Sequence, residues 1–226
     1  MTTPGPVGSA RFASVVLDVD STLSRIEGID WLAALRGDAL LREIAAMTER
    51  ATRGEIALQD VYAARLAVIR PTRAEIAQLG CEYVRTVADG AHACVEALRT
   101  AGVHVVIVSG GLRDAILPLA RSLGVPDTDL HAVGLSFADS GEYAGFDTAS
   151  PLACTGGKPV LVRELGLRTA VLAVGDGMTD AELRTAVPPA VDAFAAFTGV
   201  ARRDAVQHVA DYSIERFSQL LPIVLP

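Results

Sequence analysis

Two aspartates stand one residue apart directly after an apolar, strand-forming run, in the stretch VVLDVDSTLS at residues 15–24. Burying the carboxylates of Asp18 and Asp20 at the end of such a strand is costly unless they are paired, hydrogen-bonded or bound to a metal. Aspartates also end strands and cap helices for purely structural reasons. The pair therefore suggests a site at the carboxyl end of a strand, and this hypothesis needs support from other parts of the chain.

Two further apolar runs end in residues that could do chemistry. The run VHVVIV is followed by Ser109, Gly110 and Gly111, and a helical pattern follows at once. A small hydroxyl and exposed backbone N–H groups at a helix start can hold an anion, although this is also a common strand-to-helix turn. The run AVLAVG leads into GDGMTD, which carries Asp176 and Asp180. Parallel strands would bring all three ends to one edge of a sheet.

Carboxylates gathered at one sheet edge would require a cation, because like charges at short range cannot all stay ionised. Oxygen ligands, few of them from protein, suit Mg²⁺, which keeps several waters and favours a phosphate partner. Lys158, preceded by Thr-Gly-Gly, could present a positive side chain to that phosphate; the alternative is an ordinary solvated lysine at a helix start. The combination predicts phosphoryl transfer at a magnesium site.

In such a site an aspartate can act as nucleophile and form an aspartyl-phosphate. A second acid two residues further along an extended segment points the same way. It could protonate the leaving alcohol and then deprotonate the attacking water. The cation, Lys158, Ser109 and backbone N–H groups would stabilise the charge on the transferring phosphoryl group.

The elements that must position these residues alternate along the chain. Strands are predicted at 14–19, 103–108 and 170–175. Helices are predicted between them, at 91–102 and 112–124. Alternating strands and helices indicate an α/β fold with a parallel sheet and right-handed crossovers. Within 139–147, the pair Ser140-Gly141 lies between two short apolar runs and predicts a β-hairpin.

A helical block interrupts this alternation after the first strand. Residues 28–87 are rich in Ala, Leu, Glu and Arg, with helical spacing of apolar positions, and Thr72 and Glu75 have the spacing of a capping box. We expect this block to form a cap over the strand ends, where such sheets bind ligands. The predicted organisation is a flexible tail at 1–13, an α/β core at 14–27 and 88–226, and a helical cap at 28–87.

The composition narrows the class of protein. The 27 acidic and 20 basic residues give a net charge of −7, which argues against a general nucleic-acid binder. Cys81, Cys94 and Cys154 form neither a zinc pattern nor a disulfide framework, which favours a reducing cytoplasm. No apolar run reaches the length of a membrane span. We expect a cytoplasmic protein without a membrane segment, and the sequence leaves monomer and homodimer open.

The motifs DVDST, SGG, GGK and GDGMTD, in this order and context, resemble the four motifs of the haloacid dehalogenase superfamily. The stretches DVDSTLSRIEGIDWLA, MTERATRG, RLAVIRPT, VIVSGGLRDAILPLA and GEYAGFD are similar to its phosphoserine phosphatase branch, over about residues 14–223. The resemblance implies a doubly wound, mostly parallel, Rossmann-like sheet with a small inserted helical cap. It also implies a Mg²⁺-dependent hydrolase that converts O-phosphoserine and water to serine and phosphate, the last step of serine biosynthesis.

The resemblance further implies roles for individual residues. Asp18 would be the nucleophile and Asp20 the general acid and base; Mg²⁺ would bind Asp18, Asp176 and the main-chain carbonyl of Asp20. The phosphoryl group would be held by Ser109, Gly110, Gly111 and the catalytic Lys158. Thr179 would contact substrate, and Asp180 would orient Lys158 or a metal-bound water.

The cap and the residues after the first motif would bind the rest of the substrate. Glu27 would pair the ammonium of phosphoserine and Arg65 its carboxylate, by two parallel hydrogen bonds; the alternative is that both are ordinary charged helix residues. Thr52 and Arg53 replace Met and Gly at substrate-contacting positions, and Leu58 replaces a usual Phe. These departures leave open another small phosphorylated metabolite, or transfer of the phosphoryl group to an alcohol. A catalytically idle sensor is a third interpretation, against which the intact acidic and basic set argues.

Overall fold

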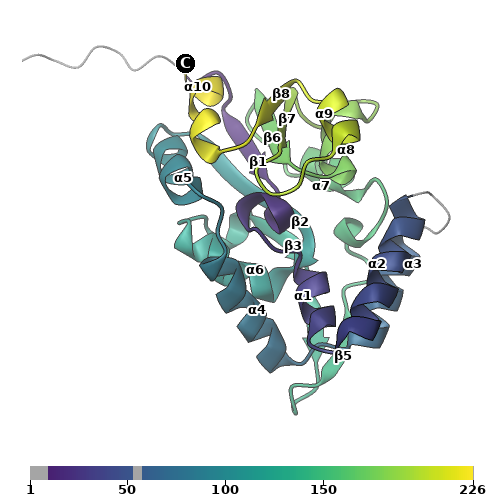
Figure 1. Cartoon of the computed structure of the whole chain (residues 1–226). Helices are drawn as coiled ribbons and strands as arrows, with labels where there is room; N and C mark the ends of the chain where they lie inside the picture. Colours follow the sequence, from purple (N-terminus) through teal and green to yellow (C-terminus); the bar gives the residue numbers. More distant parts are fainter. Residues whose placement is uncertain (1–9, 53–57, 226) are drawn as a thin grey trace, which may run out of the picture.

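The structure, a computed structural model, describes residues 10–52 and 58–225, without the side chains of 48–52, 58 and 59, and is built on a six-stranded sheet (Figure 1). Its order is β3-β2-β1-β6-β7-β8, and every neighbouring pair is parallel. The strands are β1 (Ser14–Leu17), β2 (His104–Leu112), β3 (Leu130–Val133), β6 (Val171–Gly175), β7 (Ala193–Phe197) and β8 (Tyr212–Ile214). The chain winds outward in both directions from the boundary between β1 and β6, so the predicted doubly wound α/β fold is confirmed.

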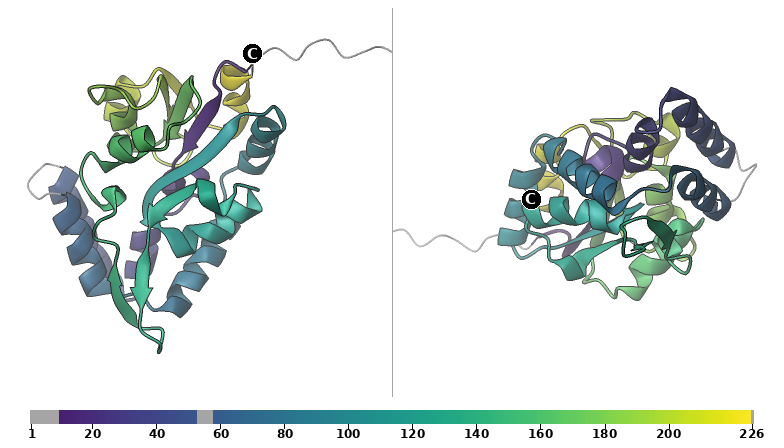
Figure 2. Two further views of the ribbon diagram at one scale, coloured as in Figure 1. Left: turned by 180° about the vertical axis from the view of Figure 1, so that it is seen from behind. Right: turned by 90° about the horizontal axis from the view of Figure 1, so that it is seen from below.

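The central strands β1 and β6 are buried over their whole length, and apart from Ser14 they are apolar, because helices cover both faces of the sheet (Figure 2). These helices are α5 (Ala91–Thr100), α6 (Arg113–Ser122), α7 (Gly157–Glu164), α8 (Met178–Thr185), α9 (Asp204–His208) and α10 (Leu221–Val224). Among the helices that the structure describes, none combines the length and the apolar character needed to cross a membrane.

The segment predicted as a flexible tail, 1–13, is packed at its inner end. Residues 1–9 lie outside the described residues. The backbone N–H of Arg11 donates to the carbonyl of Val224 at 2.8 Å, and Phe12 is buried in the core. The backbone N–H of Ala13 donates to the carbonyl of Ala170 at 2.8 Å. Residues 11–13 therefore lead into β1 as part of the packed structure.

The second strand extends further than predicted. Residues 103–108 were expected to form it, with the glycines ending the strand, but β2 runs to Leu112 and includes Ser109, Gly110 and Gly111. Its pairing with β3 shifts register between Val108 and Leu112. The glycines therefore mark an irregularity within an extended strand rather than its end, and α6 begins at Arg113.

The helical block predicted at 28–87 contains four helices in the described residues: α1 (Gly28–Ala34), α2 (Asp38–Thr52), α3 (Leu58–Ile69) and α4 (Arg73–Arg85). They lie beside the carboxyl ends of the central strands (Figure 1). Helix α4 packs closely on α6, because a Cβ added at Gly80 would lie 3.1 Å from Cγ of Pro118. The division into cap and core stays a prediction.

The predicted hairpin is present as β4 (Leu135–Phe137) and β5 (Tyr143–Phe146), which pair in antiparallel fashion. It packs on the helical block: the rings of Tyr62 and Phe146 are 5.3 Å apart, and the guanidinium of Arg73 lies 4.9 Å from the ring centre of Phe137. The backbone N–H of Arg73 also donates to the carbonyl of Gly141 at 2.8 Å. Side chains from both halves of the sequence thus join the hairpin to α3 and α4.

Helix α4 starts with the predicted capping box. The hydroxyl of Thr72 accepts from the N–H of Glu75 at 3.2 Å, and the carboxylate of Glu75 accepts from the N–H of Thr72 at 2.8 Å. We expect Thr72→Ala to lower the free energy of unfolding by about 1 kcal/mol, because one N–H of the first turn loses its acceptor. Urea unfolding measures this change. Thr72→Ser keeps the hydroxyl and serves as the control; equal stability of the two variants would contradict the prediction.

Candidate active site

The polar residues singled out from the sequence meet at the middle of the sheet. Asp18 directly follows β1, Asp176 directly follows β6, and Ser109 lies near the end of β2. Residue Leu17 pairs in parallel register with Val174 on one side and with residue 107 on the other, so the ends of β1 and β6 are level with each other and with the part of β2 that leads into Ser109. This is the point where the winding direction reverses, the usual ligand position in such sheets.

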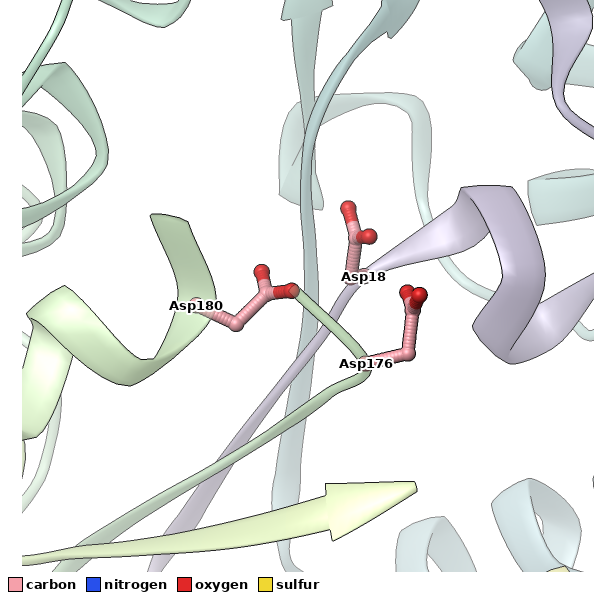
Figure 3. A group of neighbouring side chains, drawn as sticks. All are labelled: Asp18, Asp176 and Asp180. Atoms are coloured by element: carbon pink, nitrogen blue, oxygen red, sulfur yellow. The ribbon is translucent and has the colours of Figure 1, made fainter. Parts of the chain in front are cut away.

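Three aspartates form a buried cluster there. Ligand oxygens of Asp18, Asp176 and Asp180 all lie within 4.8 Å of one another (Figure 3). Asp180 reaches the cluster from the first turn of α8, and a Cβ added at Gly175 would lie 2.2 Å from its Cγ. A glycine at the end of β6 is therefore required for this approach. The backbone N–H of Gly177 donates to Oδ2 of Asp180 at 3.0 Å and holds this carboxylate in place.

Lys158, the only lysine in the sequence, lies among these acids. Its ammonium donates to Oδ1 of Asp18 at 2.8 Å and to Oδ1 of Asp180 at 2.5 Å, and the side chain is 7% exposed. Burial by itself lowers the pKa of Lys158, but the two carboxylates outweigh it and raise the pKa above its usual value. Burial and the charge of Asp18 raise the pKa of Asp180 to about 6 despite the lysine.

Close packing at the start of α7 positions this lysine. A Cβ added at Gly157 would lie 1.6 Å from the carbonyl oxygen of Pro151, so only glycine fits there. Gly156, which precedes the helix, has a φ of 71°, in the left-handed region that favours glycine. The two glycines before Lys158 are thus needed to turn the chain so that the lysine enters the site.

The residues present fit a hard divalent cation. Three buried carboxylates face Lys158 and the guanidinium of Arg203, which contacts Oδ2 of Asp176 without hydrogen-bond geometry. Thr22 donates to the other oxygen of Asp176 at 3.1 Å, while Oδ2 lacks a hydrogen-bond partner among the described residues. Oxygen donors with uncompensated negative charge suit Mg²⁺ or a similar ion. The cluster contains Asp180 in addition to the predicted Asp18 and Asp176.

Asp20 lies beside the cluster and is held separately. Its Oδ1 accepts from the N–H of Gly28 at 2.8 Å and from the hydroxyl of Tyr83 at 2.7 Å. Burial, followed by the charges of Glu27 and Asp18, raises the pKa of Asp20 to about 7. A carboxyl with such a pKa can both give and take a proton near neutral pH. The carboxylate does not belong to the three-aspartate cluster, and metal binding by the Asp20 carbonyl stays a prediction.

Tyr83 was not recognised from the sequence, because a tyrosine on the apolar face of a helix is usually a packing residue. It is fully buried on α4, and burial together with Asp20 raises its pKa well above the usual value, so it remains a hydrogen-bond donor. A Cβ added at Gly28 would lie 2.0 Å from its hydroxyl. The glycine that starts α1 therefore makes room for the tyrosine that holds Asp20. Thr22 and Arg203 were missed as well.

Glu27 and Arg65, which were predicted to bind the ammonium and the carboxylate of the substrate, both lie near α1. Glu27 accepts from the hydroxyl of Ser21 at 2.7 Å and lies 3.8 Å from Arg203, and burial raises its pKa. Arg65, on α3, donates to Asp30 at 3.2 Å, and its side chain is 13% exposed. Glu27 directly precedes α1, and Asp30, the partner of Arg65, is in the first turn of the same helix. The start of α1 therefore links the positions of Glu27 and Arg65.

The remaining predicted residues are placed as follows. Ser109 is buried, and its hydroxyl accepts from the N–H of Gly111 at 3.0 Å. A Cβ added at Gly111 would lie 2.9 Å from Oδ2 of Asp20, so this glycine borders the acid. Gly110 precedes it, and Thr179 lies half-buried in the first turn of α8. Arg53 and the side chains of Thr52 and Leu58 lie outside the described part of the chain.

The chain is similar in sequence and in fold to known proteins. The model of the haloacid dehalogenase-like hydrolase family matches residues 15–183. A phosphoserine phosphatase of Mus musculus is 39% identical over 212 residues, covering 92% of this chain and 91% of that protein. A chloroplastic one of Arabidopsis thaliana is 35% identical over 211 residues, covering 92% and 70%. A phosphoserine phosphohydrolase-like protein of Francisella tularensis superposes with a TM-score of 0.82 at 26% identity, covering 93% and 98%.

Proposed function

This chain belongs to the haloacid dehalogenase-like hydrolases, and from that premise we propose that it hydrolyses O-phosphoserine to serine and phosphate in a Mg²⁺-dependent reaction. One observation carries the proposal: a carboxylate at the end of β1 lies 2.8 Å from a buried ammonium and beside two further buried carboxylates. The identity of 39% and 35% to two phosphoserine phosphatases, over 92% of the chain in each case, supports the choice of substrate.

The proposed reaction has two steps at phosphorus. Asp18 attacks the phosphoryl group, the bond to the serine oxygen breaks, and Asp20 gives its proton to that oxygen. Water then attacks the aspartyl-phosphate, Asp20 takes the proton from the water, and phosphate leaves as the carboxylate of Asp18 is restored. The raised pKa of Asp20 and its hydrogen bonds to Gly28 and Tyr83 suit a group that must hold a proton in one step and accept it in the next.

The other residues of the site bind and stabilise. We assign the cation to Asp18, Asp176 and the main-chain carbonyl of Asp20, with Asp180 beside them; when bound, it supplies positive charge that stabilises the phosphoryl oxygens. Lys158 neutralises the same oxygens. The phosphoryl group would also accept hydrogen bonds from Ser109, Gly110, Gly111 and Thr179.

The amino-acid end of the substrate would lie between α1 and α3. Glu27 would pair its ammonium and Arg65 its carboxylate, and we retain Thr52 and Arg53 as further substrate contacts. We propose a cytoplasmic enzyme that acts as a monomer or homodimer on a small molecule. The three free cysteines, of which Cys81 is exposed, support a reducing compartment.

A substrate profile tests the function. Phosphate release is measured for O-phosphoserine, O-phosphothreonine, glycerol phosphate and an aryl phosphate, with Mg²⁺ present, after chelation, and after Mg²⁺ is restored. We expect the highest kcat/KM for O-phosphoserine, complete loss on chelation, and recovery with Mg²⁺. A parallel series with added alcohols detects phosphoryl transfer. A different preferred substrate, a dominant transfer product, or full activity under chelation would each refute the corresponding part of the proposal.

A further inference from the structure

Four buried side-chain atoms have no hydrogen-bond partner among the described residues: the hydroxyl of Tyr62, Nε of Arg65, Oδ2 of Asp176 and Oε2 of Glu182. Leaving such a group unsatisfied costs about 1–3 kcal/mol, so most buried polar groups in native proteins have a partner. Oδ2 of Asp176 belongs to the candidate cation site. The first two atoms occur together, one helical turn apart on α3.

The shared helix face brings these two groups to one place. Residues three apart on a helix are neighbours on its surface. Tyr62 is 5% exposed, and its ring is held by Phe146 of the hairpin at 5.3 Å. Arg65 is held by Asp30 at 3.2 Å, on the helix whose first N–H binds Asp20. Both side chains are therefore fixed, and one donor group on each remains free.

The charged side chains that act on the Tyr62 hydroxyl include Asp20 and Arg65, both of which belong to the candidate active site. Burial raises its pKa, the charge of Asp20 raises it further, and the charge of Arg65 opposes them. The phenol consequently keeps its proton, so it is available as a donor. An acceptor reached by both this O–H and the Nε–H of Arg65 would satisfy two buried groups at once.

We propose that Tyr62 determines specificity by donating a hydrogen bond to the carboxylate that Arg65 binds, so that the two residues together select phosphomonoesters with a carboxylate beyond the phosphoryl group. This inference rests on the proposed function. A carboxylate has two oxygens that accept several hydrogen bonds, which matches a guanidinium plus a phenol. A substrate without this carboxylate leaves both donors unsatisfied and is rejected, as polar sites reject analogues that lack the matching group.

O-Phosphoethanolamine is the matched probe, because it keeps the phosphoryl group and the ammonium of O-phosphoserine and lacks only the carboxylate. Tyr62→Phe removes the hydroxyl and keeps the ring that packs on Phe146. We expect this variant to lose about 10- to 100-fold in kcat/KM for O-phosphoserine, mainly through KM, as for a hydrogen bond to a charged group. Its kcat/KM for O-phosphoethanolamine should not fall, because the deleted hydroxyl has no partner on that substrate. Tyr212→Phe, on the edge strand β8, is the control and should change neither.

The outcomes separate the inference from the function. An equal loss with both substrates, or no loss with O-phosphoserine, would overturn the role of Tyr62 and leave the phosphoserine phosphatase proposal standing. Arg65→Ala, measured in parallel, shows whether the carboxylate site exists at all. If the wild-type enzyme hydrolysed both substrates equally well, the proposed substrate would fail, and selection by the carboxylate would fail with it. Thermal unfolding of each variant verifies that it is folded.

Discussion

Asp18→Asn is expected to abolish turnover of every phosphomonoester that the enzyme hydrolyses. The amide is a poor nucleophile, so kcat should fall by a factor on the order of 10⁴ or more, as when other enzymes lose their nucleophile. The amide oxygen can still accept from Lys158, which lies 2.8 Å from Oδ1 of Asp18, so the fold should be retained. Steady-state phosphate release with O-phosphoserine and with an aryl phosphate measures the effect.

The matched control for this variant is Asp114→Asn, an exposed aspartate in the first turn of α6. It should keep full activity, because it makes the same chemical change away from the site. Circular dichroism establishes that both variants are folded. An Asp18→Asn protein that retained more than a small fraction of wild-type turnover would show that another group attacks phosphorus.

Lys158→Met is expected to reduce both turnover and stability. Removing one partner of a buried ion pair costs about 3–5 kcal/mol, because Asp18 and Asp180 would remain buried without their cation. The loss of charge stabilisation should lower kcat by about 10²- to 10³-fold. Mg²⁺ should restore part of the stability, since a divalent ion can replace the missing positive charge. Urea unfolding with and without Mg²⁺, together with steady-state kinetics, measures these effects.

Lys158→Arg is the informative companion variant. Apart from the histidines, every other basic residue of the chain is arginine. The single lysine at this position therefore indicates that the site requires an ammonium, which is smaller than a guanidinium. The lysine is 7% exposed and bonded to two carboxylates, which leaves little room for a planar guanidinium. Because arginine restores the charge but fits less well, we expect Lys158→Arg to recover only part of the stability that Lys158→Met loses, without recovering turnover. Wild-type kinetics for this variant would show that charge alone is required at this position.

The sequence was sufficient to predict which strands end at the site. One buried apolar run that leads into an aspartate has ordinary structural explanations, but two such runs, at Asp18 and Asp176, together indicated a site, and parallel pairing aligns the ends of β1 and β6. The contribution of the helical block was harder to predict. The contact of Tyr83 with Asp20 spans 63 positions, and a tyrosine on an apolar helix face looks like any core residue. Its hydroxyl becomes functional only through the approach of α4 to Gly28, which depends on tertiary packing.

The extent of β2 shows a different limit. Glycines ordinarily end strands, and the pattern around Gly110 and Gly111 therefore indicated a turn. Their backbone stays extended, and at Gly111 the absence of a side chain lets the strand pass close to Asp20, since a Cβ there would lie 2.9 Å from Oδ2 of that acid. Close contact with residues distant in sequence reversed the local preference, and no pattern within the segment reports such contacts.

The hairpin β4–β5 has a consequence for exchanging parts between related enzymes. It packs on α3 through the rings of Tyr62 and Phe146. It packs on α4 through the guanidinium of Arg73, which lies over Phe137, and through the backbone hydrogen bond from Arg73 to Gly141. A chimera that swapped only the contiguous helical block would strip these aromatic faces of their partners and expose them to water. Successful grafting requires two separate pieces of chain, the helices and residues 135–146, to be transplanted together.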